Sequence, residues 1–530
     1  MVSSWATNKN LQTLCVFLVI LICIFTLNWE YRYYPPVWDT IAGVFSPANY
    51  LYETGFNFLS LVKEDGYSKA GPNVHVYSPI TILTAASMWA MNGDRNSVFL
   101  FLHSVQFTLA AILLTQLFNF LKNHFTIINT ILILLLVLFF PPFIVQTRYM
   151  YMELLGSLCT LMAFTAWAKG KYTTSTLAAV AACATKSFGL TLVAALIILF
   201  FMDKGRKLNR LYLIIIMCIS SIGFEALRWS QGTNFVTVDN QNYGAYFIEQ
   251  FMSRLLKTPD LYMLIMFVLI VSVYYLARNT ISKKQAHTRL INPLTDTNNR
   301  ILFGSLLVIS MFMGLIMTAP LAGKLFYPLT RYYIWVWPIL VLSFFLLLKL
   351  LLTKKQHQHQ HQNQKFNTRS NWIITIISIS LTTFFISNTS GRFYPQFEQG
   401  LTSFSIAERS MEYQEFNKMQ RYLLHSASKI KSHNVYLNRF DTYYTASPIM
   451  GYLDKKSDNF KNILTYHKNP GDLAHYPNEF SLILSNVSHG GQYMYALINQ
   501  ANNNSAVNIS VTDTYDNNGF SGLIVKFQKN

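Results

Sequence analysis

The chain has 530 residues, of which 52% are hydrophobic and only 12% are charged. Soluble proteins carry about 25% charged residues, so this composition excludes a soluble enzyme fold for most of the chain. The formal net charge of +18 would suit nucleic-acid binding in a soluble protein. Because the basic residues stand in short clusters between apolar runs, we assign them to cytoplasmic membrane loops, and we expect no nucleic-acid partner.

The first apolar run covers residues 11–27, which is about long enough to cross a bilayer together with its flanks. No small-residue cleavage site follows it, so we expect a retained helix rather than a signal peptide. Lys9 precedes the run, and the polar, aromatic stretch 28–78 follows it. This order predicts a cytoplasmic N-terminus.

Further apolar runs alternate with loops that carry Lys and Arg. The positive-inside rule places these loops in the cytoplasm, including one with Lys169 and Lys171 and one with Lys204 and Arg210. The runs cover residues 97–119, 126–146, 150–168, 172–202, 211–227, 261–277, 301–320, 332–352 and 372–388.

The segment 172–202 has two interpretations. If both flanking loops are cytoplasmic, it crosses twice as a hairpin that turns near Lys186, with arms of about 15 residues, shorter than the roughly 20 of a full span. The alternative is a single long helix, combined with a true span at residues 79–93. Because an unpaired Lys at mid-membrane would cost about 3 kcal/mol, we favour the hairpin. It places Arg148 and Glu153 outside, whereas the alternative places both in the cytoplasm.

The favoured fold is an α-helical polytopic membrane protein with about eleven transmembrane helices in residues 1–388, whose first external loop is 28–96. The odd number of crossings places the C-terminus outside. Residues 389–530 are polar and Asn-rich, and they predict an extramembrane α/β or α+β domain. Its strand-like runs are 434–437, 480–484 and 522–527.

The loop after the first helix carries a specific order of features. Asp39 stands a dozen positions beyond the membrane exit, and Glu53 follows in a helix-like stretch. His75 and Tyr77 then lead to Pro79, which begins a short apolar segment. An acid at a water-facing helix exit is suited to accept a proton from an incoming hydroxyl group.

Together with later residues, this order resembles the GT-C superfamily of polyprenyl-phosphate-sugar glycosyltransferases, which includes the protein O-mannosyltransferases and the lipid A aminoarabinose transferase. The resemblance covers roughly residues 10–210 and, weakly, 300–350. Thr40, Ser78 and Ser187 depart from that pattern. The positions that look like the family motifs are Asp39, His75-Val-Tyr-Ser-Pro79, Met91-Asn92-Gly93, Arg148 with Glu153, Thr185-Lys186-Ser187, and Arg331-Tyr332.

The resemblance implies sugar transfer on the external face with inversion at the anomeric carbon. Asp39 would be the general base, and the cations would bind the donor phosphate as negative charge develops on it. The donor-phosphate residues would be Lys186, Arg148 and Arg331, and the residues contacting substrate or metal would be His75, Glu153, Glu53 and Tyr77. Ordinary structural roles for each, such as an Arg148–Glu153 ion pair, stay open.

The implied partners are a polyprenyl-phosphate-linked sugar donor, an acceptor that is a glycan, a lipid or a protein, and the lipid bilayer. The resemblance leaves open whether a divalent metal ion serves as a cofactor. The location we favour is a bacterial inner membrane, with the C-terminal domain in the periplasm. One alternative is a lipid-linked glycan flippase or transporter, although we see no internal repeat of the kind that transporters carry. Another is an inactive relative whose external domain binds a partner.

Overall fold

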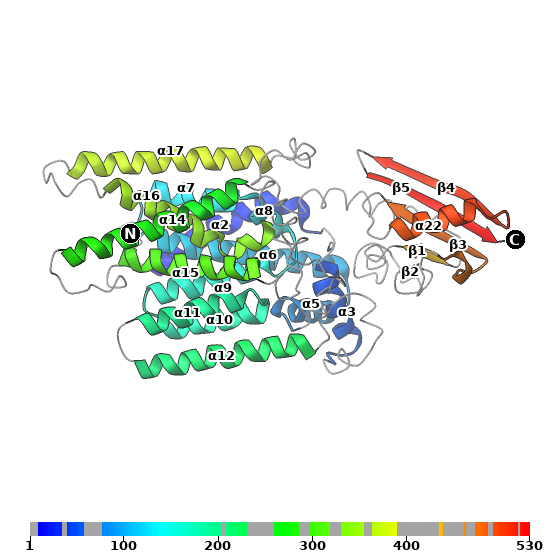
Figure 1. Ribbon diagram of the computed structural model, residues 1–530, viewed down its shortest axis with the longest axis horizontal. Coiled ribbons are helices and arrows are strands. Elements are labelled where there is room, and N and C mark those ends of the chain that lie inside the picture. The colour runs from blue at the N-terminus through cyan, green and yellow to red at the C-terminus, as the bar shows by residue number, and fades with distance from the viewer. Residues whose placement is uncertain are drawn as a thin grey trace. The chain divides into compact units, whose positions relative to one another are not determined.

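The computed structural model divides the chain into two compact units, and Figure 1 shows the elements under the labels used below. The first unit holds Met1–Tyr31, His103–Trp229 and Asn234–Glu408, and the second holds Arg32–Leu102, Ser230–Thr233 and Arg409–Asn530. The structure describes residues 9–33, 36, 40–57, 77–203, 207–230, 259–285, 297–318, 330–353, 363–389, 434–437, 460–462, 472–485, 491–517 and 520–529.

Within the described residues, four helices are long and apolar enough to cross a membrane, and a bent pair makes a fifth. This is the architecture of a helical membrane protein, as the composition predicts. The count of about eleven spans stays a prediction, because the remaining apolar helices are 10–17 residues long over their described parts, shorter than the roughly 20 of a full span. The four long segments are Asn10–Tyr31, Arg95–Leu121, Asn209–Arg228 and Thr297–Ile316.

The N-terminal helix α2 (Lys9–Asn28) matches the predicted first run. Only 6% of its apolar window is buried inside the protein, compared with 61% for α6 (Arg95–Leu121). The difference separates a peripheral helix, whose apolar surface is left for lipid, from a central one.

The predicted run 126–146 is broken into two helices. These are α7 (Ile127–Leu138) and α8 (Pro141–Arg148), which are bent by 64° relative to each other. Pro141 starts α8 at a position where a missing backbone N–H costs nothing. The two prolines therefore end one helix and begin the next.

The segment 172–202 is a hairpin, as the positive-inside argument predicts. Helix α10 (Tyr172–Thr185) ends at Lys186, whose backbone is extended, and α11 (Gly189–Met202) packs back against it. A Cβ atom at position 189 would overlap the backbone of Cys183, so this close return requires glycine. The alternative of one continuous helix is wrong.

The other helices of the first unit enclose these elements in one apolar core. Helix α9 (Glu153–Ala168) lies almost wholly inside this core, so neighbouring helices shield it despite its short length. The remaining elements are α12 (Lys207–Ser230), α14 (Pro259–Gln285), α15 (Thr297–Thr318), the 3₁₀ segment η6 (Thr330–Trp335), α16 (Trp337–Thr353) and α17 (Asn363–Thr389).

The predicted first external loop contains helices of its own in the second unit. Helix α3 (Ser46–Glu53) packs against α5 (Pro79–Ala90). Helix α5 has 12 residues, so it rises only about 18 Å, well short of the roughly 30 Å hydrocarbon core. The turn after it contains Asn92 and Gly93, both with positive φ, and the Gly93 N–H bonds the carbonyl of Met88 at 2.8 Å.

The C-terminal part of the second unit is a mixed sheet with strand order β2-β1-β3-β5-β4. Strand β1 pairs in parallel with β2 and β3, whereas β5 pairs antiparallel with β3 and β4. The predicted α/β or α+β character and the predicted strand-like runs are confirmed. The elements are β1 (Val435–Leu437), β2 (Phe460–Asn462), β3 (Glu479–Ser485), α22 (Gly491–Asn502), β4 (Val507–Asn517) and β5 (Phe520–Lys529).

Candidate functional site

Two of the predicted site residues form a buried ion pair. The Lys186 Nζ lies 2.8 Å from Glu153 Oε1, and their side chains are 11% and 0% exposed. Glu153 is the first residue of α9, and Lys186 follows the last residue of α10. Each charge therefore complements the dipole of its own helix end. The two helices bring together residues 33 positions apart.

Three aromatic rings surround the Lys186 ammonium group. Its Nζ lies 4.7 Å from the ring centre of Tyr332, 5.2 Å from Tyr151 and 5.4 Å from Phe188. Desolvated cations over ring faces gain up to about 2 kcal/mol. The rings and the carboxylate replace the water that this cation loses on burial.

The position of Tyr332 depends on a close contact between η6 and α9. The Ser157 Oγ donates a hydrogen bond to the Ile334 carbonyl at 2.7 Å. Gly156 leaves room for the Trp335 ring, and a Cβ atom there would overlap it. Arg331, a predicted phosphate ligand, is the second residue of η6. Its side chain lies outside the described part of the structure.

A second ion pair lies beside Lys186. Arg228 pairs with Glu225 on α12 and also donates to the carbonyls of Cys183 and Ala184 at the end of α10. The Ser187 Oγ donates to Glu225 Oε2 at 3.2 Å. Neither charge was among the predicted site residues, although a Glu inside the apolar run 211–227 is a signal for a buried polar partner.

Arg148 ends α8 and has a different environment. Its Nε donates to Asn28 Oδ1 at 2.9 Å, and its guanidinium carbon lies 3.9 Å above the Tyr31 ring. No ion pair joins it to Glu153, so the structural pairing considered in the sequence analysis is wrong. Among the described residues, no carboxylate pairs with Arg148.

The remaining predicted residues are not brought to this pair by the described structure. Asp39 and His75 lie outside the described residues. Glu53 is exposed at the end of α3, where it accepts a hydrogen bond from Asn49 Nδ2 at 2.9 Å. Tyr77 is half-buried just before α5. Among the described residues, no group of three or more His, Cys, Asp or Glu side chains is arranged to hold a metal ion.

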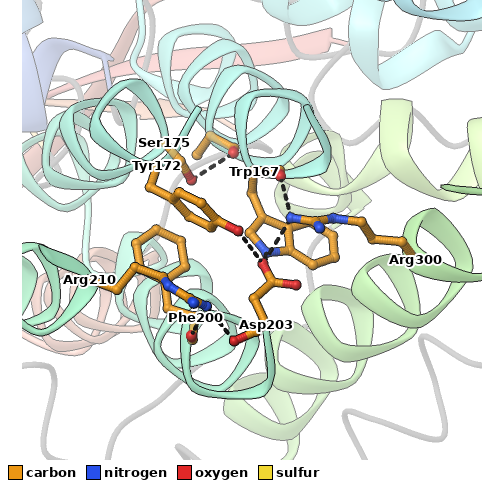
Figure 2. Close-up of polar contacts among 8 residues, drawn as sticks. Trp167, Tyr172, Ser175, Phe200, Asp203, Arg210 and Arg300 are labelled. Atoms are coloured by element: carbon orange, nitrogen blue, oxygen red, sulfur yellow. Dashed lines mark hydrogen bonds and ion pairs between the residues drawn. The ribbon is translucent and has the colours of Figure 1, made fainter. Parts of the chain in front are cut away.

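A polar cluster that contains none of the predicted site residues lies where α9 ends (Figure 2). The Asp203 Oδ2 accepts hydrogen bonds from Trp167 Nε1 at 3.0 Å, from the Tyr172 hydroxyl at 2.9 Å and from Arg300 Nη2 at 2.8 Å. Arg210 donates to the Asp203 carbonyl. This cluster links the ends of α9, α10, α11, α12 and α15 through one buried carboxylate and one backbone carbonyl.

The geometry therefore gives a candidate site at the start of α9, consisting of the Lys186–Glu153 pair, its aromatic walls and the Glu225–Arg228 pair. Arg148 precedes Glu153 by five residues in the chain, at the end of α8. No known protein family matches the sequence, and neither a curated protein nor a solved structure shows significant similarity to it.

Proposed function

We propose that the chain is a membrane glycosyltransferase that moves a sugar from a polyprenyl-phosphate donor to an acceptor on the external face. The observation that supports this most directly is the buried Lys186–Glu153 pair walled by Tyr151, Phe188 and Tyr332. Glu153 and Lys186 belong to separate motifs of the resemblance, and they lie within hydrogen-bond distance. Intramembrane ionisable groups of this kind mark functional sites by default.

The cations of the site have different roles in this proposal. Glu153 already neutralises Lys186, whereas no described carboxylate neutralises Arg148. Arg148 therefore provides the net positive charge for the donor phosphate, which a guanidinium group binds in a bidentate manner. Lys186 stabilises the additional negative charge that develops on the phosphate as the sugar departs. Arg331 would contribute a further cation.

The proposed reaction is a direct displacement. The acceptor oxygen forms a bond to the anomeric carbon while the bond between that carbon and the phosphate oxygen breaks, which inverts the configuration. The proton of the acceptor hydroxyl goes to the Asp39 carboxylate, and the bonding electrons leave with the polyprenyl phosphate. Asp39 follows Tyr31, the ring beneath Arg148, by eight residues in the chain.

Asp39→Asn tests the proposal with the purified protein and a labelled polyprenyl-phosphate sugar. We expect sugar transfer to fall by at least about a hundredfold, because general-base catalysis contributes roughly 10²–10⁴ in rate. Asp94→Asn is the matched control, since Asp94 caps α6 by accepting from the Ser97 N–H at 2.9 Å and has no proposed catalytic role. Equal transfer by the Asp39→Asn variant and the wild type would remove Asp39 from the mechanism.

A second candidate function is a lipid-linked glycan transporter. It is favoured by a further ion pair, Arg300–Asp203, at 2.8 Å, in which the carboxylate is buried. Glu153 and Trp167 mark the two ends of α9, and they lie 14 residues or about 21 Å apart along the helix. Ion pairs at both ends of a bundle suit two alternating gates. In the same assay, movement of the labelled lipid across vesicles without bond cleavage would favour the transporter.

A further inference from the structure

Basic residues from three segments of the first unit gather near the end of α9. The α6–α7 turn contributes Lys122 and His124, the α9–α10 turn contributes Lys169 and Lys171, and α16 contributes Lys349. Lys349 Nζ donates a hydrogen bond to the His124 carbonyl, which joins α16 to the first turn. We call these five residues the basic cluster.

Aromatic rings lie beneath the ammonium groups of the basic cluster. The Lys122 Nζ is 5.6 Å from the centre of the Phe118 ring, and the Lys169 Nζ is 5.6 Å from that of Phe120. The Lys349 Nζ is 5.5 Å from the Phe125 ring. These contacts hold the cations over an apolar floor instead of letting them extend freely into water.

The α9–α10 turn is built to present two lysines close together. Gly170 has a φ of 73°, and its N–H bonds the Trp167 carbonyl at 2.8 Å, while the Lys171 N–H bonds the Ala166 carbonyl at 2.8 Å. This pair of bonds ends a helix with glycine in the left-handed conformation. The tight turn leaves Lys169 and Lys171 on either side of one glycine.

The three lysines of the two turns carry charge that no carboxylate in the described part of the chain is seen to balance. No described carboxylate pairs with Lys122, Lys169 or Lys171. Burial, followed by the charges of Lys171 and Lys122, lowers the pKa of Lys169. Burial, followed by the charge of Lys349, lowers the pKa of His124. A bound anion would relieve this repulsion.

Exposed apolar side chains begin directly beside the cluster. The first turns of α7 expose Ile127 by 55%, Ile128 by 62% and Ile131 by 47%. A soluble anion would gain nothing from this surface, whereas a phospholipid would place its phosphate on the lysines and its acyl chains along the isoleucines. The two surfaces together match one amphipathic ligand.

We propose that the basic cluster binds the headgroup phosphate of an anionic phospholipid. The binding is a charge-assisted contact between the phosphate oxygens and the Lys122, Lys169 and Lys171 ammonium groups, with the acyl chains against α7. This inference does not depend on the proposed sugar transfer, because the basic cluster and the Lys186–Glu153 pair are at opposite ends of α9.

The test measures lipid binding to the purified full-length chain in neutral detergent by native mass spectrometry. Phosphatidylglycerol and phosphatidylcholine with identical acyl chains are compared. We expect phosphatidylglycerol to bind at least about tenfold more tightly, and the triple variant Lys122→Gln/Lys169→Gln/Lys171→Gln to lose that preference, because each lysine near a lipid surface contributes about 1 kcal/mol. The corresponding triple Lys→Arg variant keeps the charges and should keep the preference.

The control variant Lys207→Gln/Lys283→Gln/Lys284→Gln removes the same charge from other predicted cytoplasmic segments, and it should bind phosphatidylglycerol as the wild type does. Equal losses in both Gln variants would reduce the effect to net charge and overturn the site. Undiminished preference in the first Gln variant would also overturn it. Displacement of the lipid by millimolar inorganic phosphate would overturn the assignment to a lipid and indicate a soluble anion.

Discussion

At the scale of single residues, the buried charges make the stability of this protein sensitive to substitution. Glu153 is fully buried and its Oε1 contacts Lys186, so removing the carboxylate takes this partner from a largely buried ammonium group. Breaking a buried ion pair from one side typically costs about 3–5 kcal/mol, whereas replacing both partners by apolar groups is often neutral. This asymmetry separates a structural role of the pair from a functional one.

We therefore expect Glu153→Gln to lower the stability of the detergent-solubilised protein by about 3 kcal/mol. The double variant Glu153→Leu/Lys186→Met should recover most of that loss and still lack sugar transfer. Thermal unfolding and the transfer assay, measured on the same preparations, check both parts. A double variant that regains stability and activity together would mean that the pair only supports the fold.

His124 makes stability depend on pH. Burial, and next the charge of Lys349, lowers its pKa below the ordinary 6.5. The unfolded chain then binds a proton more readily than the folded chain, so stability decreases as the pH falls through 6.5 and levels off below the folded pKa. We expect His124→Gln to flatten the decrease in melting temperature between about pH 7 and pH 5. An unchanged slope would assign the decrease to other groups.

At the scale of elements, glycines set how closely the segments around the site approach one another. Gly156 on α9 faces the ring of Trp335, and Gly189 on α11 faces the backbone of α10. In both places a methyl group has no space. These contacts position Tyr332 over Lys186 and fix the turn that carries Lys186 itself.

Gly156→Ala should push Trp335 and η6 away from α9, at a cost of about 1–3 kcal/mol for overpacking. Sugar transfer should fall with it, because Tyr332 shifts relative to Lys186. Gly223→Ala on α12 is the matched control: no atom from outside its own helical turn is found within 4 Å of the added Cβ, and replacing a helical glycine there should stabilise by about 0.5–1 kcal/mol. Melting temperatures of the two variants measure the contrast, and a Gly156→Ala protein as stable as wild type would contradict it.

At the scale of the whole molecule, charge and apolar length determine its relation to the membrane. The described helices include four that are long enough to span and a partly buried hairpin of two shorter ones. We propose that the basic turns are cytoplasmic, and the favoured order of crossings then predicts that the C-terminal sheet is outside.

Single cysteines test this orientation in intact cells. We expect Lys171→Cys to react with a membrane-impermeant maleimide only after permeabilisation, and Lys526→Cys on β5 to react in intact cells. The parent chain gives the background, because its five cysteines lie in membrane helices or the apolar core. Reaction of both positions from the same side would contradict the predicted topology.

The amino-acid sequence alone determined the membrane character, the hairpin at Lys186 and the separate sheet region, because apolar length, charge placement and strand periodicity are local properties of the chain. It did not predict the 64° bend between α7 and α8, although the two prolines that cause it are visible in the sequence. Only the tertiary structure decided which polar and charged side chains pair with one another. Lys186 with Glu153, Ser187 with Glu225 and Arg300 with Asp203 join residues 33, 38 and 97 positions apart, and which of many charges meet depends on how the intervening helices pack.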